Sequence, residues 1–258
     1  MEYTEILIEY EEQVAKIVLN RPEKFNALSL KLLEELVDAL QHISTNKEIR
    51  VVVIKGAGPC FSTGHDLSEM VGKEITQYKR IFETCGKMMK WLQKIPQPTI
   101  AQVHGYAMAA GCQFVAACDL AVAEDGAKFS TPGVKIGLFC TTPGVPLGRN
   151  IGRKRALEML FTGRFITAQE AFEFGLINRI TSKNKLEAIT QELIDPILQS
   201  SPLTVHLGKQ AFYNQMNMTE EQAYAYAINT IALNLATHDA QEGISAFLEK
   251  RTPKWKGF

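Results

Sequence analysis

The first half of the chain alternates short β-rich runs with helical patterns. The β-rich runs are VVVIKG at 51–56, TIAQVHG at 99–105 and DLAVAE at 119–124. Between them, residues 74–94 and 108–117 have the length and apolar spacing of helices. Strand–helix–strand repetition favours a parallel sheet packed against helices, because parallel neighbours need a long crossover connection. The sequence therefore predicts an α/β fold.

Two apolar runs near the N-terminus predict a β-hairpin. The runs ILIEY at 6–10 and VAKIVLN at 14–20 are separated by the polar residues EEQ, and such a short polar break is typical of a hairpin. The next segment, LSLKLLEELVDALQHI, repeats apolar residues at the spacing of an amphipathic helix. We expect one face of that helix to be buried, namely Leu32, Leu33, Leu36, Val37 and Leu40.

The pattern changes to helices after about residue 150. Two capping-box pairs indicate helix starts, since Thr167 precedes Glu170 by three residues and Thr219 precedes Gln222 by three. Three later segments are amphipathic: 207–216, 220–235 and 242–251. Together they carry more apolar surface than a small helical tail can bury by itself. We therefore expect this tail to dock on another subunit.

The charge of the chain gives no sign of a polyanionic partner. The 258 residues include 28 basic and 28 acidic side chains, so the formal net charge at pH 7 is zero. A balanced charge argues against a general role at nucleic acids or membrane surfaces. No apolar run approaches the roughly 20 residues that a membrane-spanning helix needs. We expect neither a nucleic-acid partner nor a membrane span.

Cysteine usage and the start of the chain bear on the compartment. The cysteines are odd in number, lie in apolar segments and form no CxxC pair or zinc-like spacing: Cys60, Cys85, Cys112, Cys118 and Cys140. We expect reduced core thiols and no metal site. The first stretch, MEYTEILIEY, is polar and strand-like, without the pattern of a signal or transit peptide. The default expectation is a cytoplasmic location.

Two loops share a design that suits the binding of a carbonyl oxygen. FSTGHDL at 61–67 and AMAAGC at 107–112 each place small residues where the chain leaves a strand and a helix can begin. Small side chains let a ligand approach backbone N–H groups, and a helix N-terminus adds unsatisfied donors with a partial positive charge. Two such loops side by side would form an oxyanion hole. Glycine-rich turns also serve as packing devices, so both readings stay open.

Five separated segments resemble the crotonase superfamily, the enoyl-CoA hydratases and isomerases, in order and spacing. They are LNRPEKFNALS (19–29), FSTGHDLSEM (61–70), VHGYAMAAGCQFVAACDLAVAEDGAKFSTP (103–132), GRKRALEMLFTGRFITAQEAFEFGLINRI (152–180) and EGISAFLEKR (242–251). The resemblance implies a spiral of ββα units with an acyl-CoA pocket over 1–200. It also implies a C-terminal helical region over 201–258 that mediates trimerisation, often with two trimers stacked as a hexamer. The implied ligand is an acyl-CoA thioester, with coenzyme A as part of the substrate and no separate cofactor.

The resemblance also implies roles for residues in the matching segments. The superfamily's two oxyanion donors fall on the backbone N–H groups of His65 and Ala110. The implied substrate-binding set has Lys24 and Ala27 near the adenine and phosphates and Asp66 and Leu67 around the pantetheine and thioester. Gly111, Cys140 and Thr141 complete the set. Lys250 and Arg251, on the last helix, are expected near the nucleotide phosphates, within one subunit or across a boundary between two. A solvated basic tail is the alternative reading of this end.

The hydratase carboxylates of the superfamily are missing. In the hydratases that the chain resembles, glutamates stand at the positions of Gln113 and Gly133, where they position a water and move its proton. Glutamine orients a water but exchanges no proton at ordinary pH, and glycine has no side chain. No aspartate or glutamate occurs between Gly126 and Glu158. A relocated base would come from elsewhere, and the candidates are His65, Cys140, Thr141, Thr142, Asp66 and Glu69.

Two functions of different classes stay open. The first is an enzyme of the lyase or isomerase type that stabilises a thioester enolate with the His65 and Ala110 amides but is not expected to hydrate enoyl groups efficiently. The second is a catalytically silent acyl-CoA-binding or regulatory protein. Gln113 either satisfies backbone groups or contacts a water or the substrate. For His65, a role of the backbone alone is the simpler reading.

Overall fold

A six-stranded sheet forms the centre of the computed structural model, which describes residues 3–258. Its strand order is β1-β2-β3-β4-β6-β9, and every neighbouring pair is parallel except β1 with β2. The strands are β1 (Ile6–Glu11), β2 (Val14–Leu19), β3 (Val51–Gly56), β4 (Thr99–Val103), β6 (Leu120–Glu124) and β9 (Arg179–Thr181). A second sheet has the order β5-β7-β8 and consists of β5 (Tyr106–Met108), β7 (Lys128–Ser130) and β8 (Ile166–Thr167). The predicted parallel sheet is confirmed.

The helices of residues 3–258 fall into a group around the sheet and a group near the C-terminus. The first group is α1 (Leu30–Thr45), α2 (Ile75–Lys94), α3 (Ala110–Ala117), α4 (Thr141–Asn150), α5 (Arg153–Thr162), α6 (Ala168–Phe174) and α7 (Leu186–Gln199). The second is α8 (Pro202–Gln215), α9 (Glu220–Leu235) and α10 (His238–Glu249). Short 3₁₀ turns are η1 (Pro22–Lys24), η2 (Leu67–Met70), η3 (Pro132–Ile136) and η4 (Lys183–Lys185).

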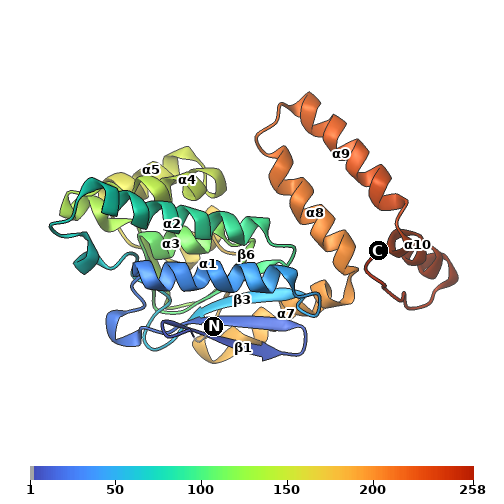
Figure 1. Ribbon diagram of the computed structural model, residues 1–258, viewed down its shortest axis with the longest axis horizontal. Coiled ribbons are helices and arrows are strands. Elements are labelled where there is room, and N and C mark those ends of the chain that lie inside the picture. The colour runs from blue at the N-terminus through green and yellow to red at the C-terminus, as the bar shows by residue number, and fades with distance from the viewer. Residues whose placement is uncertain (1–2) are drawn as a thin grey trace.

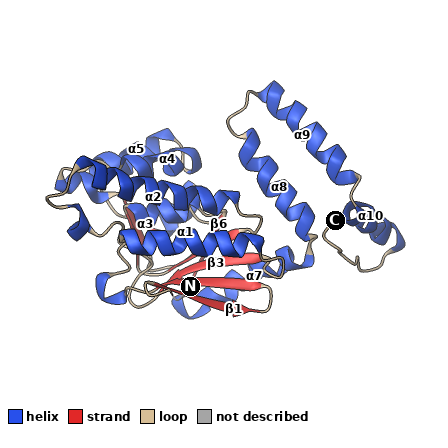
Figure 2. Ribbon diagram, in the orientation of Figure 1, coloured by secondary structure: helices blue, strands red, loops and turns tan. Residues whose placement is uncertain are grey.

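Side chains of the parallel strands alternate between two apolar layers. In β3, Val52 and Ile54 belong to the core that includes α1, α2 and α3, whereas Val51 and Val53 pack with residues of α7. Figure 2 shows α1, α2 and α3 stacked over one side of the red strands. Because both faces are covered, β2 and β4 are buried along their whole length, including the polar residues Lys16, Thr99 and Gln102.

Several local expectations are confirmed. The hairpin forms with β1 antiparallel to β2, and the five apolar residues predicted on one face of α1 are all buried. Both capping boxes are present, at the N-termini of α6 and α9. All five cysteines are buried and free. No helix within residues 3–258 is long and apolar enough to cross a membrane.

Helices α8, α9 and α10 form an arm that extends away from the sheet (Figure 1). None of the residues of α8 or α9 is buried. The arm instead exposes large apolar side chains, among them Phe212, Tyr224, Ile228, Ile231, Leu233 and Phe247. An exposed apolar surface of this extent is typical of an interaction site rather than of a free surface.

An ion pair that is largely shielded from solvent attaches the arm to the sheet layer. Asp119, between α3 and β6, accepts hydrogen bonds from the backbone N–H and the hydroxyl of Thr99. Two groups of α8 meet the same carboxylate, the ammonium of Lys209 at 2.7 Å and the hydroxyl of Tyr213 at 2.7 Å. Lys209 also donates to the carbonyl of Leu92 at the end of α2. Since all these partners are fixed, α8 has one defined position against the core.

Two loops that follow neighbouring parallel strands meet at a contact that only small residues allow. Ser62, after β3, forms an isolated parallel bridge with Ala107 of β5. A Cβ added at Gly111 would lie 2.3 Å from the Ser62 carbonyl oxygen, and one at Gly64 would lie 2.8 Å from the Ala109 Cβ. Gly64 also has a φ of 96°, which other residues rarely adopt. We call this junction of residues 61–65 with residues 106–111 the loop contact.

We predict that Gly111→Ala destabilises the protein, because the new methyl group must displace the backbone of Ser62. Overpacking of this kind costs about 1–3 kcal/mol. The matched control is Gly148→Ala in α4, where a Cβ meets no described atom within 4 Å and the loss of glycine flexibility stabilises by about 0.5–1 kcal/mol. Urea unfolding followed by circular dichroism should give a lower midpoint for Gly111→Ala only. Equal midpoints for the two variants would contradict the close loop contact.

Candidate functional site

A cavity of about 820 Å³ lies at the carboxyl ends of the parallel strands β2, β3 and β4. The segments that follow these strands supply much of its wall, and the segment after β7 supplies the rest. The lining includes ten residues that the sequence analysis named as site candidates: Lys24, Ala27, His65, Asp66, Leu67, Ala110, Gly133, Cys140, Thr141 and Thr142. The described lining does not include Gly111, Gln113, Lys250 or Arg251. The carboxyl edge of a parallel sheet is the usual place for a ligand.

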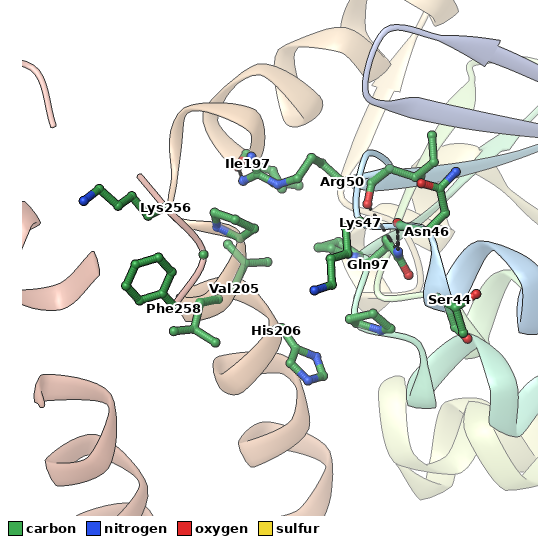
Figure 3. Close-up of a pocket in the computed structure, with 17 residues that line it drawn as sticks. Ser44, Asn46, Lys47, Arg50, Gln97, Ile197, Val205, His206, Lys256 and Phe258 are labelled. Atoms are coloured by element: carbon green, nitrogen blue, oxygen red, sulfur yellow. Dashed lines mark hydrogen bonds between the residues drawn. The ribbon is translucent and has the colours of Figure 1, made fainter. Parts of the chain in front are cut away.

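A second cavity, of about 580 Å³, lies at the opposite edge of the sheet. It is bounded by the segments that precede β3 and β4, by α8 and by the C-terminal residues. Figure 3 shows Lys47 and Gln97 on the core side and His206, Lys256 and Phe258 on the side of the arm. None of the residues that the sequence singled out lies in its described lining. The cavity at the carboxyl ends of the strands is therefore the candidate site.

Two backbone N–H groups in the wall of the candidate site have no protein acceptor. Ala110 is the first residue of α3, so its N–H is among the donors that a helix leaves unsatisfied. The bridge between Leu28 and His65 uses the Gly64 carbonyl and the Asp66 N–H, which leaves the His65 N–H free. Within residues 3–258, neither amide donates a hydrogen bond. Two free donors on adjoining loops are able to bind an oxygen that gains negative charge.

The His65 imidazole is an uncharged, buried ring in the cavity wall at neutral pH. Burial lowers its pKa to about 4, so the ring is uncharged near pH 7. The ring packs edge-on against Phe82, with 5.0 Å between the centroids. Its Nε2 atom is buried and has no hydrogen-bond partner among the described residues. The side chain is thus poorly suited to holding a proton, whereas its backbone N–H remains available.

Gln113 is buried beside the site with an unused acceptor. Its side chain is 4% exposed, and its Oε1 atom has no partner within residues 3–258. Gln113 follows Ala110 by three residues in α3, so both lie on one face of the helix. A buried amide oxygen without a partner is costly, because it has lost its water. The position therefore calls for a donor from a water or a ligand.

Gly133 belongs to the cavity wall and leaves no room for a side chain. A Cβ there would lie 2.2 Å from the Leu138 carbonyl oxygen and 2.8 Å from the Sγ atom of Cys140. The first distance involves backbone, so a larger residue would force the 133–138 segment to move. The absence of a carboxylate at this position is therefore built into the local backbone.

Cys140 lies at the N-cap of α4 and faces the same cavity. The residue is 7% exposed. Burial raises the pKa of its thiol, and a backbone hydrogen bond from Gly133 acts in the opposite direction. Thr141, the next residue, donates its hydroxyl to the Phe139 carbonyl at 3.2 Å.

The Asp66 carboxylate forms an ion pair and caps a 3₁₀ turn. Its carboxylate pairs with the Arg21 guanidinium at 2.9 Å and accepts hydrogen bonds from the Ser68 N–H and hydroxyl at the start of η2. Burial acts to raise the Asp66 pKa, but the Ser68 and Arg21 hydrogen bonds outweigh it and hold the pKa below its ordinary value. The carboxylate therefore stays charged and is a weak base.

Lys250 and Arg251 are remote from the cavity of their own chain. The last helix ends at Glu249, so the expectation that both residues lie on it is wrong. The reason is local, since Lys250 adopts a left-handed conformation with a φ of 55° and caps the helix. Arg251 pairs with Glu242 through two bonds of 2.6 and 2.9 Å, and with Glu249 at 2.6 Å. Its charge is thus already compensated.

Sequence reasoning did not find three features of this site. It missed the capture of Asp66 by Arg21, the position of Cys140 against Gly133, and the Phe82 ring on His65. The first and third join separate segments of the chain, and the second depends on how the 133–138 turn folds, so no spacing along the chain signals them. Within residues 3–258, no group of three or more His, Cys, Asp or Glu side chains is arranged to hold a metal ion.

Comparison with known proteins identifies relatives over nearly the whole chain. The family model described as enoyl-CoA hydratase/isomerase matches residues 9–257. The mitochondrial enoyl-CoA hydratase domain-containing protein 3 of Danio rerio is 45% identical over 250 residues, which are 96% of this chain and 86% of the relative. An enoyl-CoA hydratase from Mycobacterium smegmatis has a solved structure with a TM-score of 0.96 and 43% identity, covering 98% of this chain and 99% of that one. The crystal structure of human enoyl-CoA hydratase domain-containing protein 3 has a TM-score of 0.95 and 43% identity, covering 98% of this chain and 100% of that one.

The expectation of a cytoplasmic location is wrong by this comparison. The Danio rerio relative and its Homo sapiens counterpart are both named mitochondrial. The expectation relied on the absence of a leader pattern from the first ten residues, two of which lie outside the described part of the chain. Such an absence carries no information about the compartment.

The resemblance of the five sequence segments is confirmed by these matches. Both the family model and the structural neighbours extend from the N-terminal hairpin to the C-terminal arm. The chain belongs to the enoyl-CoA hydratase/isomerase family and has the crotonase fold.

Proposed function

We propose that the protein binds an acyl-CoA thioester in the cavity at the carboxyl ends of β2, β3 and β4 and polarises its carbonyl with the His65 and Ala110 amides. The observation that carries the proposal is the pair of amides without acceptors in one cavity wall. Membership of the family supports the thioester as the ligand. The negative charge that develops on the thioester oxygen is stabilised by these donors, because they are already oriented when the ligand arrives.

Loss of a proton from the α-carbon of the polarised thioester gives an enolate, whose oxygen the two amides hold. Apolar side chains such as Phe82, Met108 and Leu138 line the cavity beside the amides, and a dry surrounding strengthens the two hydrogen bonds. The neutral His65 ring contributes no charge. Lys24 and Ala27 lie on the segment after β2, where the coenzyme A nucleotide binds in this proposal. Lys250, rather than the ion-paired Arg251, contacts the phosphates of the coenzyme A that is bound in a neighbouring subunit.

Efficient hydration is not part of the proposal. Gln113 and Gly133 stand where related hydratases have glutamates, and the acidic residues in the described cavity lining are Glu23 and Asp66. Glu23 is exposed at η1, and Asp66 is held by Arg21. The same observation supports the second candidate, a catalytically silent protein that binds acyl-CoA. Turnover of any acyl-CoA thioester distinguishes the two.

The proposed assembly is a homotrimer or a pair of stacked trimers. We take residues 1–200 as the core with the acyl-CoA site and residues 201–258 as the region that joins subunits. The apolar residues on α9 and α10 support this division, since they need a partner surface. Lys250 lies on the same arm, so assembly would also bring it to a neighbouring site.

We predict micromolar binding of butyryl-CoA together with very slow hydration of crotonyl-CoA. The loss of general acid–base help at two positions removes roughly 10²–10⁴-fold in rate for each position, although the two effects are not additive. Calorimetry measures the binding, and the loss of the enoyl absorbance measures the hydration. Hydration at about 10 per second, the ordinary rate of enzymes, would show that the two glutamates are not needed here. An absence of binding heat with every acyl-CoA tested would remove the proposed ligand.

We also predict a mass of three or six times the chain's 28.8 kDa by light scattering at micromolar concentration. Ile228→Asp should lower this mass, because Ile228 on α9 is 62% exposed and belongs to the proposed interface. The matched control is Val71→Asp, since Val71 is 77% exposed but lies outside the arm. A monomeric wild-type protein, or equal effects of the two changes, would contradict the interface.

A further inference from the structure

The cavity contains few groups that are free to carry a proton at the carbon next to the thioester carbonyl. The His65 ring has a low pKa because it is buried, and Asp66 is paired with Arg21. The Thr141 hydroxyl already donates to a backbone carbonyl. Lys135 is exposed on the segment after β7. Among the described lining residues with a titratable hydrogen, Cys140 is the one that is both buried and without an acidic or basic partner.

The Cys140 sulfur lies next to the place that a side chain at residue 133 would occupy. The Sγ atom is 2.8 Å from the point that a Cβ at Gly133 would occupy. A backbone hydrogen bond from Gly133 also reaches this sulfur. The thiol therefore fills the part of the wall from which a side chain at residue 133 would start. Its position at the N-terminus of the ten-residue helix α4 favours the charged thiolate form.

A second observation is an unsatisfied acceptor on the helix that carries Ala110. The Gln113 Oε1 atom is buried and lacks a donor, and the residue lies on the helix face of Ala110. Cys112, the neighbour of Gln113, is close enough to Cys140 for the two thiols to influence each other electrostatically. The His65 and Ala110 amides, the buried and unpartnered His65 Nε2 and Cys140 belong to residues that line one cavity.

We propose that the Cys140 thiol exchanges the α-proton of the bound acyl-CoA thioester, an inference that rests on the proposed function. The thiolate takes a proton from the α-carbon, the electron pair of the broken C–H bond forms the C=C bond, and the carbonyl π pair moves to the oxygen, which gives the enolate. The His65 and Ala110 amides hold that oxygen. In the reverse step the S–H bond breaks, the proton returns to the α-carbon, and the carbonyl is restored. No oxidant, reductant or second substrate is needed.

The resting form of the thiol determines which half of this exchange is easier. Burial keeps Cys140 mainly protonated at neutral pH, so it is ready to donate to an enolate that forms in the cavity. The chemical class of reaction that suits the site is therefore one that passes through a thioester enolate and ends with protonation of its α-carbon. This class needs no carboxylate at residue 113 or 133.

The exchange is tested with butyryl-CoA in deuterium oxide, because this ligand has α-protons but no double bond to hydrate. Mass spectrometry of the recovered ligand measures deuterium uptake. Wild-type protein should exchange the α-protons, and Cys140→Ala should lose about 10²–10⁴-fold in rate, the usual contribution of a positioned acid or base. Cys140→Ser should lose as much, since a hydroxyl of nearly the same size is a far weaker acid. Cys85→Ala is the matched control, because Cys85 is a buried thiol of α2 outside the described cavity lining.

Calorimetry with butyryl-CoA is run on the same four proteins. Bound ligand with no exchange in the wild type, or unchanged exchange in both Cys140 variants, would overturn the role of Cys140 and leave the binding proposal intact. If the wild type binds no butyryl-CoA, the proposed function fails and the role of Cys140 fails with it. Circular dichroism of the serine variant, which differs by one atom, separates a lost proton carrier from a misfolded protein.

Discussion

The loop contact between residues 61–65 and 106–111 is the constraint on which the site depends. The segments after β3 and β4 meet there because Gly64 and Gly111 leave no side chain between the backbones. A methyl group at either glycine would separate them. With the contact closed, the His65 and Ala110 amides face one cavity and have no acceptor of their own within residues 3–258. The proposed binding of a polarised oxygen thus depends on close backbone packing rather than on any charged side chain.

The same cavity has no side chain at residue 133, where the proposal expects the carboxylate of a hydratase, and the lack is structural. Gly133 cannot receive a side chain, because the Leu138 carbonyl occupies the space. Asp66 is held by Arg21 and caps η2. In the proposed function, the wall therefore combines strong polarisation of a carbonyl with weak proton transfer. Cys140, beside Gly133, is the group that restores proton transfer in our account, and it does so at the α-carbon rather than on a water.

Much of the fold was predictable from local pattern, whereas the chemistry of the site was only partly so. The apolar runs of β3, β4 and β6, the buried face of α1 and the two capping boxes each depend on residues close in sequence. The short strands β5, β7 and β8 have two or three residues each, too few to show a period. The small-residue loops indicated where free amides would lie. The Arg21–Asp66 pair arises from tertiary packing, the Cys140–Gly133 contact from the fold of the 133–138 turn, and the ion pairs of Arg251 from the way the chain leaves α10. Spacing along the chain reveals none of the three.

The central claim is that two backbone amides polarise a thioester carbonyl, and the carbonyl stretch of the ligand reports this directly. Infrared difference spectroscopy of butyryl-CoA labelled with ¹³C at the carbonyl isolates that band from the protein. Ala110→Pro removes one donor at the first position of α3, where helices accept proline. The account predicts a shift to lower frequency on binding to the wild-type protein and a smaller shift with Ala110→Pro. A bound ligand whose carbonyl absorbs at the same frequency as in water would contradict it.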